Sequence, residues 1–284
     1  MAARGRRPFF VNAATFALLT FACVGPAFSV DWTRFEPLFW RDVVLSGVLC
    51  ALGNACLVAA LGRGKLSILG PINAWKAVVG LTFAFFLLGE APTLPALFGV
   101  FLIGVGSYFV LDAAPERFSF RLLLTNAAIR LRVAALILTA LEAIFIKKIV
   151  LAAGPSTAFF LWSATGALFS ALSLGVAALI PLISTRLRPL PPTARLAPPS
   201  PTSRFSARDA LELAATAACV GTMQLSTNFA FKRLDVGLAL ALFQLSAPLN
   251  VLLGWRLFRE RGVVKKLFGA SVAVVGAACV VLFG

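Results

Sequence analysis

Two opposite charges lie near the middle of long apolar segments of this chain. Lys76 is almost at the centre of residues 66–88, and Glu142 is almost at the centre of residues 133–153. A charge at the centre of a membrane costs about 2.5 to 3.5 kcal/mol on insertion scales, so each residue is expected to face protein or water and to have a partner. The two side chains form either a static ion pair that fixes helix packing, or a binding site. In the second case Glu142 binds a proton or a cationic group, and Lys76 binds an anionic group.

The composition predicts that these charges are positioned by membrane-spanning helices. Of the 284 residues, 60% are hydrophobic and 13% are charged, and the mean hydropathy is +0.93. Soluble domains are about half apolar and a quarter charged, so a soluble enzyme is excluded. Because about 20 apolar residues cross a bilayer, we expect nine spans. They are residues 9–30, 43–61, 66–88, 93–111, 133–153, 156–183, 211–231, 236–258 and 267–284.

The formal net charge of +15 comes from basic residues in short clusters between the apolar runs. Nucleic acid is therefore not expected as a partner, because its binding requires one basic face. Nineteen Lys and Arg residues fall on the side of the N-terminus and six on the opposite side. By the positive-inside rule this predicts a cytoplasmic N-terminus and an external C-terminus. The first apolar run follows Arg4, Arg6 and Arg7 and is interpreted as a span rather than a signal peptide, because it is long enough to cross a bilayer.

Metal and cofactor chemistry lack the usual ligands in this sequence. The chain contains no His, and its five Cys residues lie inside apolar runs without a CxxC pair. Neither a zinc or iron site nor a disulfide framework is predicted, and no cofactor is expected.

Three further segments carry expectations about packing. The sixth span is longer than a bilayer requires and is predicted to end near Pro181. Residues 184–207 hold six prolines and are interpreted as a flexible loop, and residues 113–132 as a basic amphipathic segment on the membrane surface. Lys147 and Lys148 are expected to be structural, with long side chains that reach toward the interface.

An internal repeat becomes visible when the chain is shifted by 170 residues. Glu90 then aligns with Glu260, Gly99 with Gly269, and Gly106 with Gly276, without a gap. The repeat unit follows spans two to four in the first copy and spans seven to nine in the second. Because five crossings separate these starting spans, equivalent helices should run in opposite directions. Inverted repeats are the architecture of alternating-access carriers, whose substrate site lies near the membrane midplane.

Polar residues on equivalent faces of the two copies are predicted to line a shared wet cavity. Asn73, Lys76 and Gly80 share one helical face, and the equivalent positions are Phe243, Ser246 and Asn250. Asn54 in one copy, with Gln224 and Asn228 in the other, adds amides from neighbouring helices, each of which could instead bond to an adjacent helix. The candidate substrate-binding residues are Asn54, Asn73, Lys76, Glu142, Gln224, Ser246 and Asn250.

The segments from Gly70-Pro71 through Glu90 to Gly106, and from Pro248 through Glu260 to Gly276, resemble the two halves of the EamA family of the drug/metabolite transporter superfamily. The resemblance implies a ten-helix carrier of two inverted five-helix units that moves small metabolites or organic solutes. It also implies that both termini are cytoplasmic, which conflicts with the charge count. Here residues 1–112 hold four predicted spans as a first repeat, and residues 133–284 hold five as a second. The first repeat therefore has one span fewer than the family pattern, and that span would precede Phe9.

The sequence therefore predicts an all-helical polytopic membrane protein that works as a secondary transporter, with no enzymatic activity. The expected partners are a small-molecule substrate, a coupling proton and the lipid bilayer, and the expected state is a monomer or homodimer in a bacterial inner membrane. The alternatives are a membrane enzyme acting on lipid, which would need a nucleophile, base or metal cluster near an interface, and a scaffold, which would have a dry apolar helix interface. A channel is disfavoured because no filter motif is visible.

Overall fold

The computed structural model describes residues 8–61, 72, 75–89, 93–112, 126–187, 206–243, 248–249, 251–252, 256 and 262–283. Every regular element in these ranges is helical: nine α-helices and two short 3₁₀ helices. Each α-helix falls within or overlaps one of the nine apolar runs. The expected fold class, an all-helical polytopic membrane protein, is confirmed.

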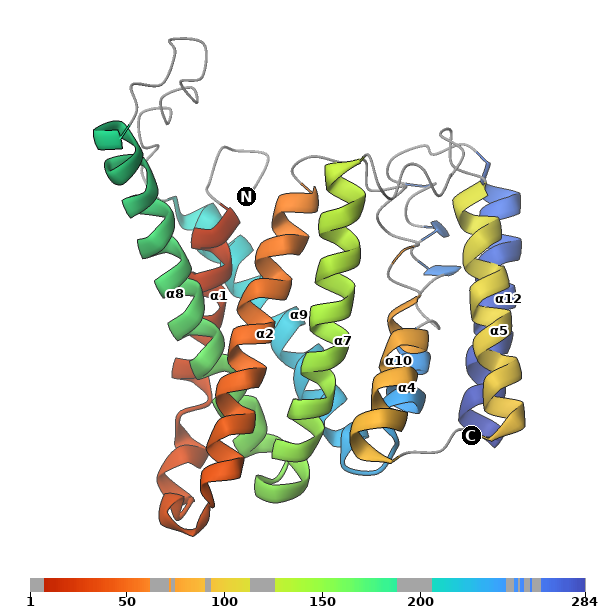
Figure 1. Cartoon of the computed structure of the whole chain (residues 1–284), viewed down its shortest axis with the longest axis horizontal. Helices are drawn as coiled ribbons and strands as arrows, with labels where there is room; N and C mark the ends of the chain where they lie inside the picture. The colour runs from red at the N-terminus through yellow and green to blue at the C-terminus, as the bar shows by residue number, and fades with distance from the viewer. Residues whose placement is uncertain are drawn as a thin grey trace.

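The helices lie side by side along the long axis of the molecule (Figure 1). The α-helices are α1 (Pro8–Ala22), α2 (Pro37–Leu61), α4 (Trp75–Leu88), α5 (Leu94–Asp112), α7 (Ala127–Ala153), α8 (Pro155–Leu187), α9 (Ala207–Phe231), α10 (Val236–Leu242) and α12 (Val263–Phe283). The 3₁₀ helices η2 (Gly25–Ser29) and η3 (Trp32–Arg34) lie between α1 and α2.

Three of these helices are long and apolar enough to cross a membrane by length and composition, within the described ranges. The qualifying segments are Pro37–Leu57, Pro155–Gly175 and Val263–Phe283. Shorter apolar helices occupy Phe10–Ala22, Trp75–Leu88 and Leu94–Phe109. A span needs about 20 apolar residues, so the three qualifying segments have the length of a bilayer crossing.

Local sequence sets both ends of α7 and the turn that joins it to α8. Asn126 caps the start of α7, where its side chain accepts hydrogen bonds from the backbone N–H groups of Ala128 (2.9 Å) and Ile129 (3.4 Å). The helix ends at Gly154, whose φ of 85° is a conformation that residues with a Cβ rarely adopt. Pro155 follows at once as the first residue of α8, a position where its missing N–H costs nothing. The two long helices are therefore joined by a single residue.

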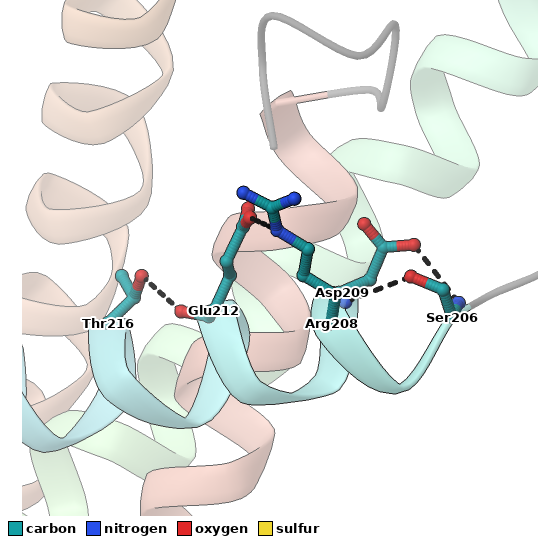
Figure 2. A network of polar contacts seen from close by, with 5 residues as sticks. All are labelled: Ser206, Arg208, Asp209, Glu212 and Thr216. Carbon is teal, nitrogen blue, oxygen red and sulfur yellow. Dashed lines mark hydrogen bonds and ion pairs between the residues drawn. The ribbon is translucent and has the colours of Figure 1, made fainter.

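The start of α9 is fixed by a polar network that Figure 2 shows in close-up. The Ser206 side chain accepts from the Asp209 N–H at 3.2 Å, and the Asp209 carboxylate accepts from the Ser206 N–H at 3.1 Å. This reciprocal capping box satisfies two backbone donors that the helix itself leaves unpaired. In the same first turns of the helix, Arg208 and Glu212 form an ion pair at 3.4 Å. Polar groups thus cap the N-terminal end of this apolar helix.

Packing arranges the helices as a row in which α1 and α8 pair at one edge and α5 and α12 at the other (Figure 1). Between these edges, α7 packs against α2 and α4, and α4 packs against α10. One large hydrophobic cluster runs through the bundle, with fully buried members such as Ile103, Ile144 and Phe231. A smaller cluster around Ala60 and Ile129 joins the end of α2 to the start of α7.

The α5–α12 pair has backbone-to-backbone contact at two glycine crossings. A Cβ on Gly99 would lie 2.5 Å from the Gly276 carbonyl oxygen, and one on Gly276 would lie 2.5 Å from the Gly99 oxygen. A Cβ on Gly106 would likewise lie against the Gly269 carbonyl oxygen. The Thr93 hydroxyl, just before α5, donates to the Phe283 carbonyl at the end of α12. The two helices are therefore antiparallel, and small residues allow their close approach.

Three helix ends differ from the sequence expectation. The first apolar run was expected as one span through residue 30, but α1 ends at Ala22 and the 3₁₀ helix η2 follows, with a proline at its start. Proline lacks the N–H that would continue an α-helix, which explains the break. Helix α8 continues to Leu187, past Pro181, where the sixth span was expected to end. Helix α7 begins at Ala127, so Arg130 and Arg132 lie in its first turns rather than in a separate surface segment.

Candidate functional site

A cavity of about 70 Å³ lies between helices α4, α7, α9 and α10. Its polar lining brings together Lys76 of α4, Thr139 and Glu142 of α7, and Gln224 and Thr227 of α9. Apolar side chains complete the wall, from Ala143, Ile146, Met223, Phe231, Leu240 and Phe243. Polar groups from three helices thus converge on a small cavity whose wall they share with apolar side chains.

Glu142 is the most tightly held polar group of the cavity. It is only 9% exposed, and its Oε1 accepts a hydrogen bond from the Trp162 indole Nε1 at 2.8 Å. The Cys50 thiol of α2 is a second hydrogen-bond partner of this carboxylate. The carboxylate is thus oriented from two neighbouring helices while it lines the cavity.

Lys76 lies on the opposite helix, near the start of α4, and is partly buried. Its charge interacts with Glu142 and also with Arg132, which is near the start of α7. Among the residues that the structure describes, the Lys76 ammonium makes no direct hydrogen bond or ion pair. The ion pairs between described residues do not include Lys76 with Glu142, the static alternative considered from the sequence, although the two charges act on each other.

Gln224 belongs to a chain of amides that ends on the backbone of α8. Its Nε2 donates to the Asn228 Oδ1 at 3.0 Å, and the Asn228 Nδ2 donates to the Pro155 carbonyl at 3.2 Å. Asn228 is completely buried. The amides expected from the sequence are therefore partly used for helix contacts, and Gln224 is the one that lines the cavity.

The remaining predicted site residues have different outcomes. Asn54 is not among the residues that line the cavity. Its Nδ2 donates to the Cys50 Sγ at 3.4 Å, and Cys50 in turn lies beside Glu142. Asn73, Ser246 and Asn250 lie outside the described residues, as do Pro71 and Glu90. The structure thus brings together Lys76, Glu142 and Gln224.

Sequence reasoning missed Thr139, Thr227 and Trp162. Thr139 precedes Glu142 by three residues and Thr227 follows Gln224 by three, so both lie on the faces of residues already singled out. The indole N–H of a tryptophan in the middle of a span needs a partner, which was the available signal for Trp162.

Lys147 forms an ion pair with a residue of the connection between α9 and α10. Its side chain is 9% exposed, and its Nζ forms an ion pair at 3.2 Å with Asp235, just before α10. This contact joins α7 to the α9–α10 connection, directly after the cavity residue Ile146. The expected structural role of Lys147 agrees with this pairing.

Comparisons with known proteins support the same fold. A crystal structure of a protein that is 18% identical matches with a TM-score of 0.69 and covers 96% of this chain and 86% of that one. This likeness concerns the fold alone. An uncharacterized protein of Methanocaldococcus jannaschii is 33% identical over 63 residues, which are 22% of this chain and about half, 46%, of that relative.

One family match covers the first four helices. Residues 1–112 match the EamA-like transporter family, and that range contains Lys76 and the glycine crossings of α5. This match agrees with the resemblance drawn from the sequence: residues 1–112 are similar to the EamA-like transporter family, which belongs to the drug/metabolite transporter superfamily.

Proposed function

We propose that the chain is a secondary transporter of a small polar or amphipathic solute, with its substrate site in the cavity between α4, α7, α9 and α10. The observation that carries the proposal is that this cavity collects a carboxylate, an ammonium and an amide from three helices that are distant in sequence. In hydrocarbon such groups are costly unless they bind one another, water or a ligand. A scaffold with a dry apolar interface would not need them.

Two inverted copies of a helical unit would supply the alternating access. Helices α2 and α9 begin at Pro37 and Ala207 and end at Leu61 and Phe231, so both ends obey the offset of 170 residues. The crossings of Gly99 with Gly276 and of Gly106 with Gly269 relate equivalent helices in antiparallel fashion. The cavity takes Lys76 from the first copy and its other polar groups from the second, so rocking one copy against the other would expose it to each side in turn.

Within this mechanism Glu142 binds either a coupling proton or a cationic group of the solute, and Lys76 binds an anionic group. The charged group that acts on Glu142 among the described residues is Lys76 of α4, and the neutral Cys50 thiol of α2 lies beside the carboxylate. Protonation of the carboxylate would remove its attraction for both the ammonium and a bound cation, and so would link solute binding to the proton gradient.

The test is transport by purified protein in liposomes, with a panel of radiolabelled amino acids, nucleosides and organic cations. A melting-temperature screen with the same panel selects the solutes that bind. Glu142→Gln is expected to lower the transport rate at least tenfold and to remove its dependence on pH. Glu36→Gln, which changes an exposed carboxylate outside the bundle, is the control and should behave as wild type. Wild-type rates and pH dependence in Glu142→Gln would exclude Glu142 from the mechanism.

A further inference from the structure

The first two turns of α8 contact the two best-fixed polar groups of the cavity, although α8 itself contributes no lining residue. Trp162 bonds to Glu142, and the Pro155 carbonyl bonds to Asn228, which holds Gln224. Pro155 and Trp162 are seven residues apart and therefore lie on one face of the helix. We infer that Trp162 and Asn228 are positioning residues, through which this face of α8 sets the places of the carboxylate and the amide. The inference rests on the proposed function of the cavity.

The indole of Trp162 is held on both sides and leaves little freedom to its hydrogen bond. The residue is 6% exposed. The Phe16 ring of α1 meets it edge-on, with ring centroids 4.8 Å apart, and Phe159 stacks on it at 5.9 Å. A hydrogen bond to a charged group contributes about 1.5 to 3 kcal/mol and strengthens in a buried site. Since the bond uses Oε1 of Glu142, Oε2 retains capacity to bind a proton or a cationic group.

Asn228 uses both ends of its amide in these contacts. Its NH₂ donates to the Pro155 carbonyl and its oxygen accepts from Gln224. An aspartate would keep the acceptor but would lose the donor and add a buried charge. The amide of Gln224 therefore has a fixed donor end, and its carbonyl oxygen stays available to a solute.

Helix α8 is suited to this role because it is closely tied to α7. Only Gly154 separates the end of α7 from Pro155, and the Gly154 N–H donates to the Val150 carbonyl at 2.8 Å. The spacing between Glu142 on α7 and Trp162 on α8 is thus set by a one-residue turn. Preorganisation of this kind keeps a binding group in place before the ligand arrives.

The contact itself is tested without a ligand, by nuclear magnetic resonance of the full-length protein with ¹⁵N-labelled indoles. The five tryptophans give five Nε1–H signals, and Trp162→Phe assigns the relevant one. If that variant does not fold, the other four Trp→Phe variants assign it by elimination. Glu142→Gln is expected to shift the Trp162 signal and to leave that of Trp40, an exposed residue in the α1–α2 region, unchanged. An unmoved Trp162 signal would overturn the inference for Trp162.

The positioning role is tested in the liposome assay with the panel solutes. Trp162→Phe and Asn228→Asp are each expected to raise the half-saturation concentration about tenfold and to change the maximal rate less. Their matched controls are Trp40→Phe and Asn12→Asp; Asn12 lies on α1, where it donates to Ser170 rather than to a cavity group. Wild-type half-saturation in a cavity variant would overturn the role of that residue.

The two failures are distinguishable. If the wild-type protein transports no panel solute while Glu142→Gln shifts the Trp162 signal, the proposed function fails and the contact stands. In that case a double-mutant cycle of melting temperatures decides the positioning claim. Trp162→Phe and Glu142→Gln should be non-additive, because the first removes and the second weakens the same hydrogen bond, whereas Trp40→Phe and Glu142→Gln should be additive.

Discussion

Single residues in this bundle carry polar groups that nearly always have a named partner. Among the described side chains, the Ser46 hydroxyl of α2 is the buried polar atom without a hydrogen bond. Ser163 of α8 is equally buried, but its hydroxyl donates to the Phe160 carbonyl at 2.9 Å. A buried hydroxyl without a partner costs free energy, while one with a partner contributes a little.

At this scale we predict opposite effects for two identical substitutions. Ser46→Ala should leave the free energy of unfolding unchanged or raise it by about 1 kcal/mol, because it removes an unpaired buried group. Ser163→Ala should lower it by up to about 1 kcal/mol, because it removes a bond. Thermal unfolding of the two purified variants, followed by circular dichroism, measures the difference. A lower melting temperature for Ser46→Ala than for Ser163→Ala would contradict the prediction.

Among the elements, α5 and α12 depend most on residue size for their contact. In a membrane, helices gain little from burying apolar surface against each other, so close backbone approach through glycine supplies much of the packing. Gly99 meets the Gly276 backbone directly, whereas Gly104 on the same helix has only the Trp75 ring at 3.8 Å as its nearest neighbour. Gly99 and Gly104 therefore differ in their tolerance for a methyl group.

Gly99→Ala is expected to destabilise the protein by about 1 to 3 kcal/mol, because its Cβ would lie 2.5 Å from a backbone oxygen that cannot move alone. Gly104→Ala should be neutral or slightly stabilising, since its Cβ meets only an ordinary van der Waals contact and alanine favours the helix. Melting temperatures of the two variants in detergent provide the comparison. Equal losses of stability would show that the glycine crossing does not determine the packing of α5 on α12.

For the whole molecule, the proposal of inverted copies requires that equivalent helices begin on opposite sides of the membrane. Pro37 and Ala207 are the exposed first residues of α2 and α9, and they are related by the repeat offset. The distribution of Lys and Arg further predicts that the N-terminal side of the bundle, where α9 begins, is cytoplasmic.

Cysteine labelling tests both statements. In a background without the five native cysteines, a membrane-impermeant maleimide added to intact cells should label Pro37→Cys at once. It should label Ala207→Cys only after the membrane is permeabilised. The reverse pattern would correct the orientation and retain the inversion, whereas equal labelling of both sites in intact cells would refute the inverted arrangement.

The sequence by itself determined the helices, because apolar runs of about 20 residues have one stable solution in a bilayer. It also determined which charges needed explanation: Lys76 and Glu142 were conspicuous in hydrocarbon, and both line the cavity. Local exceptions, such as the end of α1 before η2, depended on where a proline falls relative to the helix end.

Only the tertiary structure decided which polar groups share a partner. Asn54 and Gln224 looked alike in the sequence, yet one bonds to Cys50 behind Glu142 and the other lines the cavity. The hydrogen bond of Trp162 to Glu142 depends on how the start of α8 packs on α7. The ion pair of Lys147 depends on the position of Asp235 before α10. Hydrophobic periodicity specifies that a helix is buried, but the rotation and neighbours of each helix arise from packing, which joins residues far apart in the chain.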